Sequence, residues 1–273
     1  MIYISTAMYI EAQEIIKRLG LKRDNSINKF EVFKNDEVTL IITGVGKVKS
    51  AVALTYLLSR QEITQNDLYI NFGVCGTKDK QIEQGEVFLC SKITDNDTKF
   101  TYYSDLLFKH PFKEGSIETF SKVANEGESD ELLVDMEASS LYQAASVFFK
   151  PHQIMFIKVV SDYLSTENID RDFVLKVVEK NIHRVIEWIN YIKDNFIKSR
   201  QVLTQAEEEL IKKVSENLKM SATMENEFRQ LMIYHKLLDN DITELIDIYL
   251  KIECKSKNEG KMHLAELKRR IIK

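Results

Sequence analysis

The first two thirds of the chain alternate short apolar runs with longer segments in which apolar residues recur every three or four positions. This alternation is typical of a layered α/β domain, in which helices cover a central sheet. The predicted strands are Ile2–Ser5, Lys29–Phe33, Val38–Thr43, Leu68–Asn71, Val87–Lys92, Leu132–Asp135 and Ile154–Ser161. The predicted helices are Ala7–Leu19, Val48–Arg60, Met136–Phe149 and a long segment of about Asp170–Phe196.

The pattern changes after residue 197, where no further strand is predicted. Thr204 and Glu207 form a capping-box pattern before an apolar-periodic run. Further helices are predicted at Gln205–Lys219, Thr223–Leu238, Ile242–Ile252 and Lys261–Ile272. We therefore predict an α/β domain over residues 1–197 and an all-helical appendage over residues 198–273.

Composition narrows the class of protein. The chain has 273 residues and a net charge of −4, so its overall field does not favour nucleic acid or membrane surfaces. The three cysteines and five histidines lack disulfide or zinc spacing, so we expect neither a metal nor a cofactor. No apolar stretch reaches the roughly 18–20 residues of a membrane span, and Met1 leads directly into a predicted strand. These features predict a cytoplasmic protein.

Two short carboxylate motifs stand at the ends of buried elements. Val134–Ala138 opens an apolar helix, and Val159–Asp162 ends an apolar strand. Charged groups at such positions are unfavourable unless they bind something, and in α/β layers these ends face the ligand crevice. Simpler interpretations exist, because Asp162 could cap the next helix and Glu137 could favour a helix N-terminus electrostatically.

Glycines mark two further segments, Thr43–Lys47 and Asn71–Gly76, in which they permit tight turns and close backbone approach to a ligand. Thr43–Lys47 is neither a phosphate-binding P-loop nor a dinucleotide fingerprint, because Val48 and Lys49 occupy positions that these patterns reserve for other residues. Cys75, in the expected Gly73–Gly76 turn, has no histidine partner in view and is interpreted as a small space-filling residue.

Five blocks of residues, in order, resemble the nucleoside phosphorylase/nucleosidase superfamily, especially the methylthioadenosine/S-adenosylhomocysteine nucleosidases. The resemblance covers residues 1 to about 195 and leaves the helical tail outside. It implies a three-layer α/β/α domain with a central mixed sheet, a small-molecule nucleoside substrate and a homodimer. The blocks are Ser5–Glu11, Thr43–Lys47, Asn71–Gly76, Val134–Ala138 and Lys158–Asp162.

The resemblance also implies roles for individual residues. Asp162 matches the aspartate that hydrogen-bonds the purine and protonates N7, and Glu137 matches the glutamate that grips the ribose hydroxyls. Glu11 matches the glutamate that positions or deprotonates the attacking water. The implied reaction is hydrolysis of methylthioadenosine, S-adenosylhomocysteine or 5′-deoxyadenosine to adenine and the 5′-modified ribose. The other expected substrate contacts are Met136, Ser161, Gly73, Val74, Cys75, Gly76 and, stacking on the base, Phe120.

Two alternatives stay open. Phosphorylases of the superfamily hold phosphate with arginines and a serine, whereas this chain has no arginine before Arg18 and carries Val74 at the serine position. Water is therefore the expected nucleophile, with phosphorolysis as the alternative. The other alternative is a catalytically weak nucleoside-binding module whose helical tail binds a partner.

The chain departs from the family pattern at two further places. Lys158 replaces the usual arginine, and the segment Ser91–Leu132 is shorter than in the family. Within that segment, Tyr103, Phe108 and His110 are assigned to the 5′ side of the substrate or to a dimer contact.

Overall fold

The computed structural model describes residues 1–164, 171–194, 203–238 and 241–271. The chain forms two compact units, Met1–Ile197 and Lys198–Lys273. Asp170, Phe196 and Ile272, which end predicted helices, lie outside the described residues. Among the described helices, none combines the length and apolar composition that crossing a bilayer requires.

The first unit contains a ten-stranded mixed sheet. Its strands are β1 (Ile2–Thr6), β2 (Lys22–Arg23), β3 (Glu31–Lys34), β4 (Val38–Ile42), β5 (Leu68–Thr77), β6 (Val87–Asp95), β7 (Thr101–Tyr103), β8 (Lys113–Thr119), β9 (Leu133–Asp135) and β10 (Ile154–Asp162). Its helices are α1 (Tyr9–Arg18), α2 (Lys47–Leu58), α3 (Ala138–Ser146) and α4 (Arg171–Ile192), with a short 3₁₀ turn at Pro151–Gln153. The predicted α/β class is confirmed.

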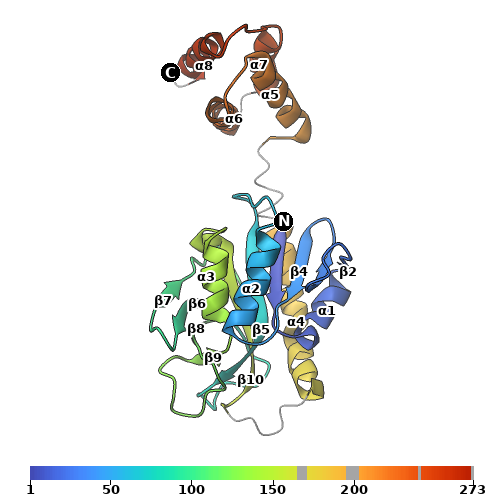
Figure 1. Ribbon diagram of the computed structural model, residues 1–273, viewed down its shortest axis with the longest axis vertical. Coiled ribbons are helices and arrows are strands. Elements are labelled where there is room, and N and C mark those ends of the chain that lie inside the picture. The colour runs from blue at the N-terminus through green and yellow to red at the C-terminus, as the bar shows by residue number, and fades with distance from the viewer. Residues whose placement is uncertain (165–170, 195–202, 239–240, 272–273) are drawn as a thin grey trace. The chain divides into compact units, whose positions relative to one another are not determined.

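Helices cover both faces of this sheet, which gives the predicted three layers (Figure 1). One hydrophobic core lies between the sheet and helices α1 and α4, and the other lies beneath α2 and α3. Alternation along each strand supplies both cores, because successive side chains point to opposite faces. On β1, for example, Ile2 and Ile4 join the first core, whereas Tyr3 joins the second.

Five of the strands close into a ring. Strand β10 pairs with β5 on one side and with β6 on the other, and β6, β8, β9 and β5 pair in succession. The closure places the end of β10 beside the end of β5, with Asp162 opposite Gly76. It also places Val134 of β9 opposite the same glycine. The ring therefore brings three of the blocks that are distant in sequence to one place.

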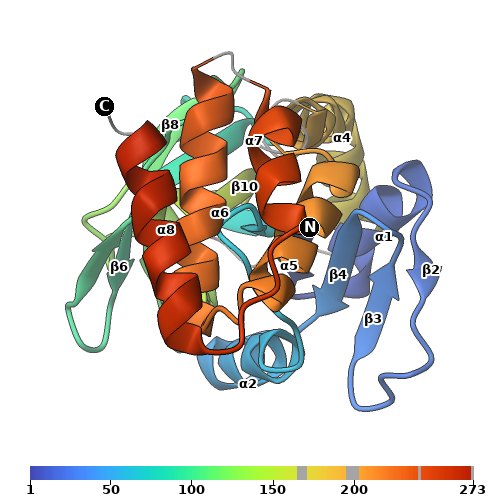
Figure 2. The same ribbon diagram turned by 90° about the horizontal axis from the view of Figure 1, so that it is seen from above.

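The described residues of the second unit form a bundle of four helices, which confirms the predicted all-helical C-terminal region. Its helices are α5 (Gln205–Asn217), α6 (Ala222–Leu237), α7 (Ile242–Leu250) and α8 (Lys257–Ile271). Thr204 caps α5, and Glu207 completes the predicted capping box by accepting from the Thr204 N–H. Figure 2 shows α8 beside α6, and residues of all four helices, Phe228 and Leu264 among them, form one buried core.

Gly260 allows α8 to contact the end of α5 closely. A Cβ placed on Gly260 would lie 1.9 Å from the Leu218 carbonyl oxygen, far inside van der Waals contact. Gly260→Ala is therefore expected to lower the free energy of unfolding of this unit by about 1–3 kcal/mol, despite the higher helix propensity of alanine. Hydrogen exchange of the α5 and α8 amides measures the effect. The exposed neighbour Lys261→Ala is the control, and equal protection in both variants would contradict the prediction.

Candidate active site

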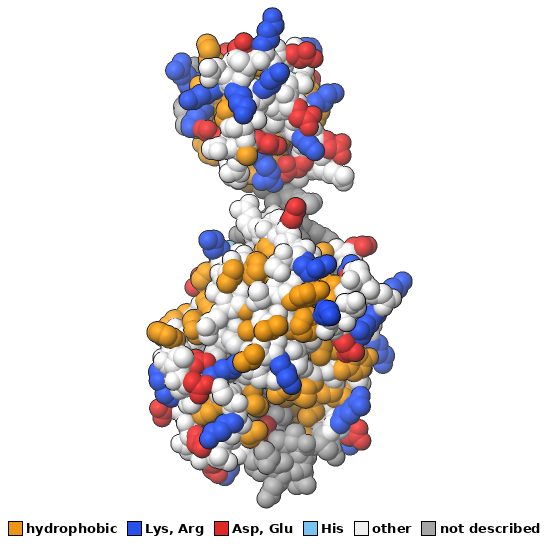
Figure 3. All heavy atoms as spheres, viewed as in Figure 1, with side chains coloured by type: hydrophobic (Ala, Val, Ile, Leu, Met, Phe, Trp, Pro, Cys, Tyr) orange, Lys and Arg blue, Asp and Glu red, His pale blue; other side chains and the backbone are white. Residues whose placement is uncertain are grey.

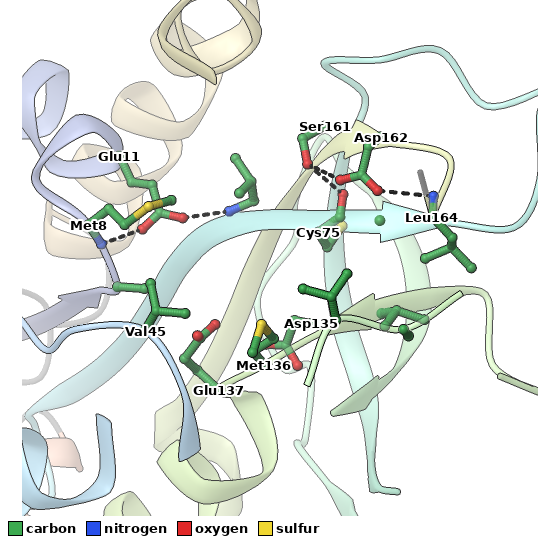
Figure 4. Close-up of a pocket in the computed structure, with 16 residues that line it drawn as sticks. Met8, Glu11, Val45, Cys75, Asp135, Met136, Glu137, Ser161, Asp162 and Leu164 are labelled. Atoms are coloured by element: carbon green, nitrogen blue, oxygen red, sulfur yellow. Dashed lines mark hydrogen bonds between the residues drawn. The ribbon is translucent and has the colours of Figure 1, made fainter. Parts of the chain in front are cut away.

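The first unit contains a cavity of about 210 Å³ at the ends of β5, β9 and β10 (Figure 4). Four carboxylate residues line it, and the remaining lining residues are mostly small or aliphatic. No lysine, arginine or aromatic ring is among the described residues that line it. The lining consists of Ala7, Met8, Glu11, Val45, Val74, Cys75, Gly76, Val123, Ala124, Val134, Asp135, Met136, Glu137, Ser161, Asp162 and Leu164.

Glu11 stands in the first turn of α1 and is only 2% exposed. Its Oε2 accepts a hydrogen bond from the Met8 N–H at 2.8 Å, and its Oε1 accepts one from the Val74 N–H at 3.0 Å. Burial raises the pKa of Glu11, while the Val74 and Met8 N–H groups and the Lys158 ammonium counteract this shift. The carboxylate is therefore fixed between α1 and β5, with a raised proton affinity.

Glu137 precedes the first residue of α3 and is 7% exposed. Its Oε1 accepts a hydrogen bond from the Gly46 N–H at 2.8 Å, which ties α3 to the glycine loop before α2. Burial, and secondly the Asp135 charge, raise the pKa of Glu137 to about 7, against the opposing effect of Lys158. Near neutral pH this side chain therefore exchanges a proton readily.

Asp162 ends β10 at a bulge. The register with β5 shifts between Val160 and Asp162, so Ser161 is the extra residue, and such a bulge redirects the neighbouring side chains. The Ser161 hydroxyl lies 2.6 Å from Asp162 Oδ2, and the Leu164 N–H donates to Oδ1 at 3.0 Å. Both carboxylate oxygens are thus held in place at the end of the cavity opposite Glu11 and Glu137 (Figure 4).

Gly73 and Gly76 correct one expectation, because they lie in strand β5 and not in a turn. A Cβ on Gly76 would lie 2.6 Å from Leu164 Cδ2 and 2.9 Å from Asp162 Oδ1. A Cβ on Gly73 would lie 3.2 Å from Glu11 Oε1. The two glycines therefore leave room on the strand for the two carboxylates, although Gly73 itself does not line the cavity.

Phe120 is a second correction, since it does not line the cavity either. It is 4% exposed and packs with Ala124, Val134 and Leu164, whose side chains form the wall in front of it. The other aromatic candidates of this segment also lie away from the lining. Tyr103 is 61% exposed on β7, and the ring of His110 stacks at 6.1 Å on Phe112.

The structure brings the other eight expected residues to one cavity: Glu11, Val74, Cys75, Gly76, Met136, Glu137, Ser161 and Asp162. Cys75 is 3% exposed, and burial raises the pKa of its thiol, so it stays a protonated, space-filling group. Sequence reasoning missed the wall residues Val123, Ala124 and Leu164. Their apolar character alone does not separate them from core residues, and only the chain path of the β8–β9 loop places two of them here.

The arrangement can carry out acid–base chemistry. Its carboxylates stand at both ends of one partly apolar cavity, and paired carboxylates can supply the acid and the base for cleavage of a glycosidic bond. Within the described part of the chain, no group of three or more histidine, cysteine, aspartate or glutamate side chains is placed to hold a metal ion.

Comparison with known proteins identifies the fold. No protein-family model matches the chain. A curated 5′-methylthioadenosine/S-adenosylhomocysteine nucleosidase of Marinomonas sp. (strain MWYL1) is 32% identical over 79 residues, which are 29% of this chain and 33% of that protein. The match therefore spans about a third of the length of this relative.

Solved structures match over a much longer range. The S-adenosylhomocysteine nucleosidase of Streptococcus pyogenes, in complex with 5-methylthiotubericidin, has a TM-score of 0.59 at 20% identity, covering 70% of this chain and 96% of its own. The 5′-methylthioadenosine nucleosidase of Arabidopsis thaliana has a TM-score of 0.59 at 19% identity, covering 70% and 95%. A futalosine hydrolase mutant of Helicobacter pylori has a TM-score of 0.58 at 15% identity, covering 70% and 98%. These likenesses confirm the predicted resemblance to the nucleoside phosphorylase/nucleosidase superfamily at the level of the fold.

Proposed function

We propose that the chain is a nucleosidase that hydrolyses the N-glycosidic bond of a 5′-modified adenosine to adenine and the 5′-modified ribose. One observation carries the proposal: Glu11, Glu137 and Asp162, which are far apart in the sequence, line a single cavity. The fold likeness to nucleosidases and to complexes of these enzymes with nucleoside analogues supports it further.

In this proposal each carboxylate has a separate task. Asp162, held by Ser161 and the Leu164 N–H, hydrogen-bonds the purine and delivers a proton to N7. Glu137 binds the ribose hydroxyls, and its charge stabilises the developing sugar cation. Glu11, fixed by two backbone N–H groups, orients and deprotonates the attacking water. Met136 packs beside the ribose, since it lines the cavity directly before Glu137.

The charge of the cavity favours water over phosphate as the nucleophile. A bound phosphate dianion needs arginine, lysine or several N–H partners. The described lining carries four carboxylates and no basic side chain. The apolar part of the lining favours an uncharged 5′ group on the substrate, because Met8 and Val45 lie near Glu11 (Figure 4). Methylthioadenosine and 5′-deoxyadenosine are therefore the preferred substrates over S-adenosylhomocysteine.

Release of free adenine tests the proposal. The purified protein is incubated with each of the three nucleosides, with and without added inorganic phosphate, and adenine is measured by chromatography. We expect adenine release that does not depend on phosphate. Strict dependence on phosphate, with ribose 1-phosphate as product, would favour the phosphorylase alternative. A protein that binds these nucleosides but releases no adenine would be a binding module.

We propose in addition that the first unit forms a homodimer through the face that carries α2 and α3. Hydrophobic side chains gather on this face in Figure 3. Val48 and Val52 of α2 are 78% and 57% exposed, and Val45, in the loop before α2, is 42% exposed and lines the cavity. Sedimentation equilibrium is expected to show a dimer that Val48→Glu with Val52→Glu converts to a monomer. A wild-type monomer at micromolar concentration would contradict this proposal.

A further inference from the structure

A buried ion pair adjoins the cavity, since Asp135 is among the lining residues and Lys158 is its partner. Lys158 of β10 is 1% exposed, and its Nζ donates to Asp135 Oδ2 at 2.7 Å. Asp135 also accepts from the Ala138 N–H at 2.8 Å and, at Oδ1, from the Thr119 hydroxyl at 2.7 Å. The carboxylate therefore accepts three hydrogen bonds from the protein, which leaves it little capacity for a ligand. Lys158 itself does not line the cavity.

The two members of the pair adjoin different carboxylates. Lys158 lies opposite Gly73 in the β5–β10 register, and a Cβ on Gly73 would be 3.7 Å from Lys158 Nζ and 3.2 Å from Glu11 Oε1. The ammonium group and the Glu11 carboxylate thus flank the same point on the strand. Asp135, by contrast, stands two residues before Glu137 and binds the first N–H of the helix that Glu137 precedes.

We infer that Lys158 and Asp135 act together as positioning residues, which set the charge of Glu11 and Glu137 through their ion pair at the wall of the cavity. The inference rests on the proposed nucleosidase function, because it concerns the two carboxylates that act on water and ribose. A buried ion pair gives little net stability in general, because desolvation offsets most of its attraction. The pair lies beside both Glu11 and Glu137, so an effect on these two carboxylates explains its presence better than a contribution to stability does.

The charged groups around Glu11 and Glu137 give the pair opposite effects. The Lys158 charge lowers the pKa of Glu11, which faces in addition the N–H groups of Val74, Met8 and Ala7. Around Glu137, the charges of Asp135 and Glu11 raise the pKa, whereas Lys158 and the Gly46 N–H lower it. Removing the cation must therefore raise both proton affinities, and removing the Asp135 charge must lower that of Glu137.

The pH dependence of kcat/KM for adenine release tests this inference. The wild-type rate is expected to fall as the pH drops below about 7, where Glu137 takes up a proton. Lys158→Gln, which keeps a hydrogen-bond donor for Asp135, is expected to move this acid limb to higher pH and to lose roughly tenfold more activity at pH 6 than at pH 8. Asp135→Asn is expected to move the limb to lower pH. Lys158→Arg, which keeps the charge, is expected to leave it in place.

Opposite displacements separate this role from a merely structural one. The inference would be overturned if the acid limb of the pH profile stays in place in both variants, or shifts in the same direction in Lys158→Gln and Asp135→Asn. This holds even if both variants are less active. Circular dichroism establishes that each variant is folded, and Lys158→Met replaces Lys158→Gln if the latter is not. Failure of the wild-type protein to release adenine would instead refute the proposed function, and the inference with it.

Discussion

Replacing Glu11 by glutamine is expected to lower kcat for adenine release by about a hundredfold to ten-thousandfold, with little change in KM. Glutamine has nearly the same shape and can still accept one of the two backbone hydrogen bonds, from Met8 or from Val74. It cannot accept a proton from water, however, and its amide group meets the second N–H as an unfavourable donor–donor contact. Steady-state kinetics with methylthioadenosine measure the loss.

Glu14 gives a matched control one helical turn further along. It is also buried, but its carboxylate pairs with Lys17 and Arg18 and does not line the cavity. Glu14→Gln is therefore expected to keep kcat within about twofold of the wild type, because Glu14 lies outside the cavity lining and its ion-pair partners Lys17 and Arg18 are exposed. Equal losses in Glu11→Gln and Glu14→Gln would mean that the helix needs its acidic residues for folding, and would remove Glu11 from the proposed mechanism.

The elements that could be predicted are those with a strong hydrophobic pattern in their own sequence. Apolar strands such as Ile154–Asp162 and periodic helices such as Tyr9–Arg18 were predicted within a few residues of their observed ends. Strand β8, Lys113–Thr119, was not predicted, because its sequence carries three charged residues and a glycine. It is a strand because β6 and β9 pair with both of its edges, and that pairing is tertiary.

The candidate site likewise has a part that the sequence predicts and a part that it does not. Glu11, Glu137 and Asp162 were found because each stands in a short block of recognisable residues. The resemblance predicts that they meet at one substrate, but not the hydrogen bonds that hold them there, such as Val74 to Glu11 and Gly46 to Glu137, which join residues 63 and 91 positions apart. The structure does not place Phe120 in the cavity lining, for a related reason: an aromatic residue beside a site fills the core as readily as it faces a ligand.

Replacing Asp162 by asparagine is expected to lower kcat/KM for methylthioadenosine by about a hundredfold to ten-thousandfold, with the fold intact. Asparagine can accept from the Leu164 N–H as Asp162 Oδ1 does, and its amide can donate to the Ser161 hydroxyl. The local structure therefore survives, and the lost function is delivery of a proton to the purine. Adenine is a poor leaving group without that proton, so the chemical step should slow far more than binding weakens.

A substrate whose leaving group needs no proton distinguishes this role from a structural one. A 4-nitrophenyl riboside releases a stable phenolate, so the difference between the wild type and Asp162→Asn is expected to shrink to within about tenfold. Glu11→Gln must still be impaired with this substrate, because the water still has to be activated. If Asp162→Asn loses as much with the nitrophenyl riboside as with methylthioadenosine, then Asp162 acts on binding or local folding, and protonation of the base must come from another group.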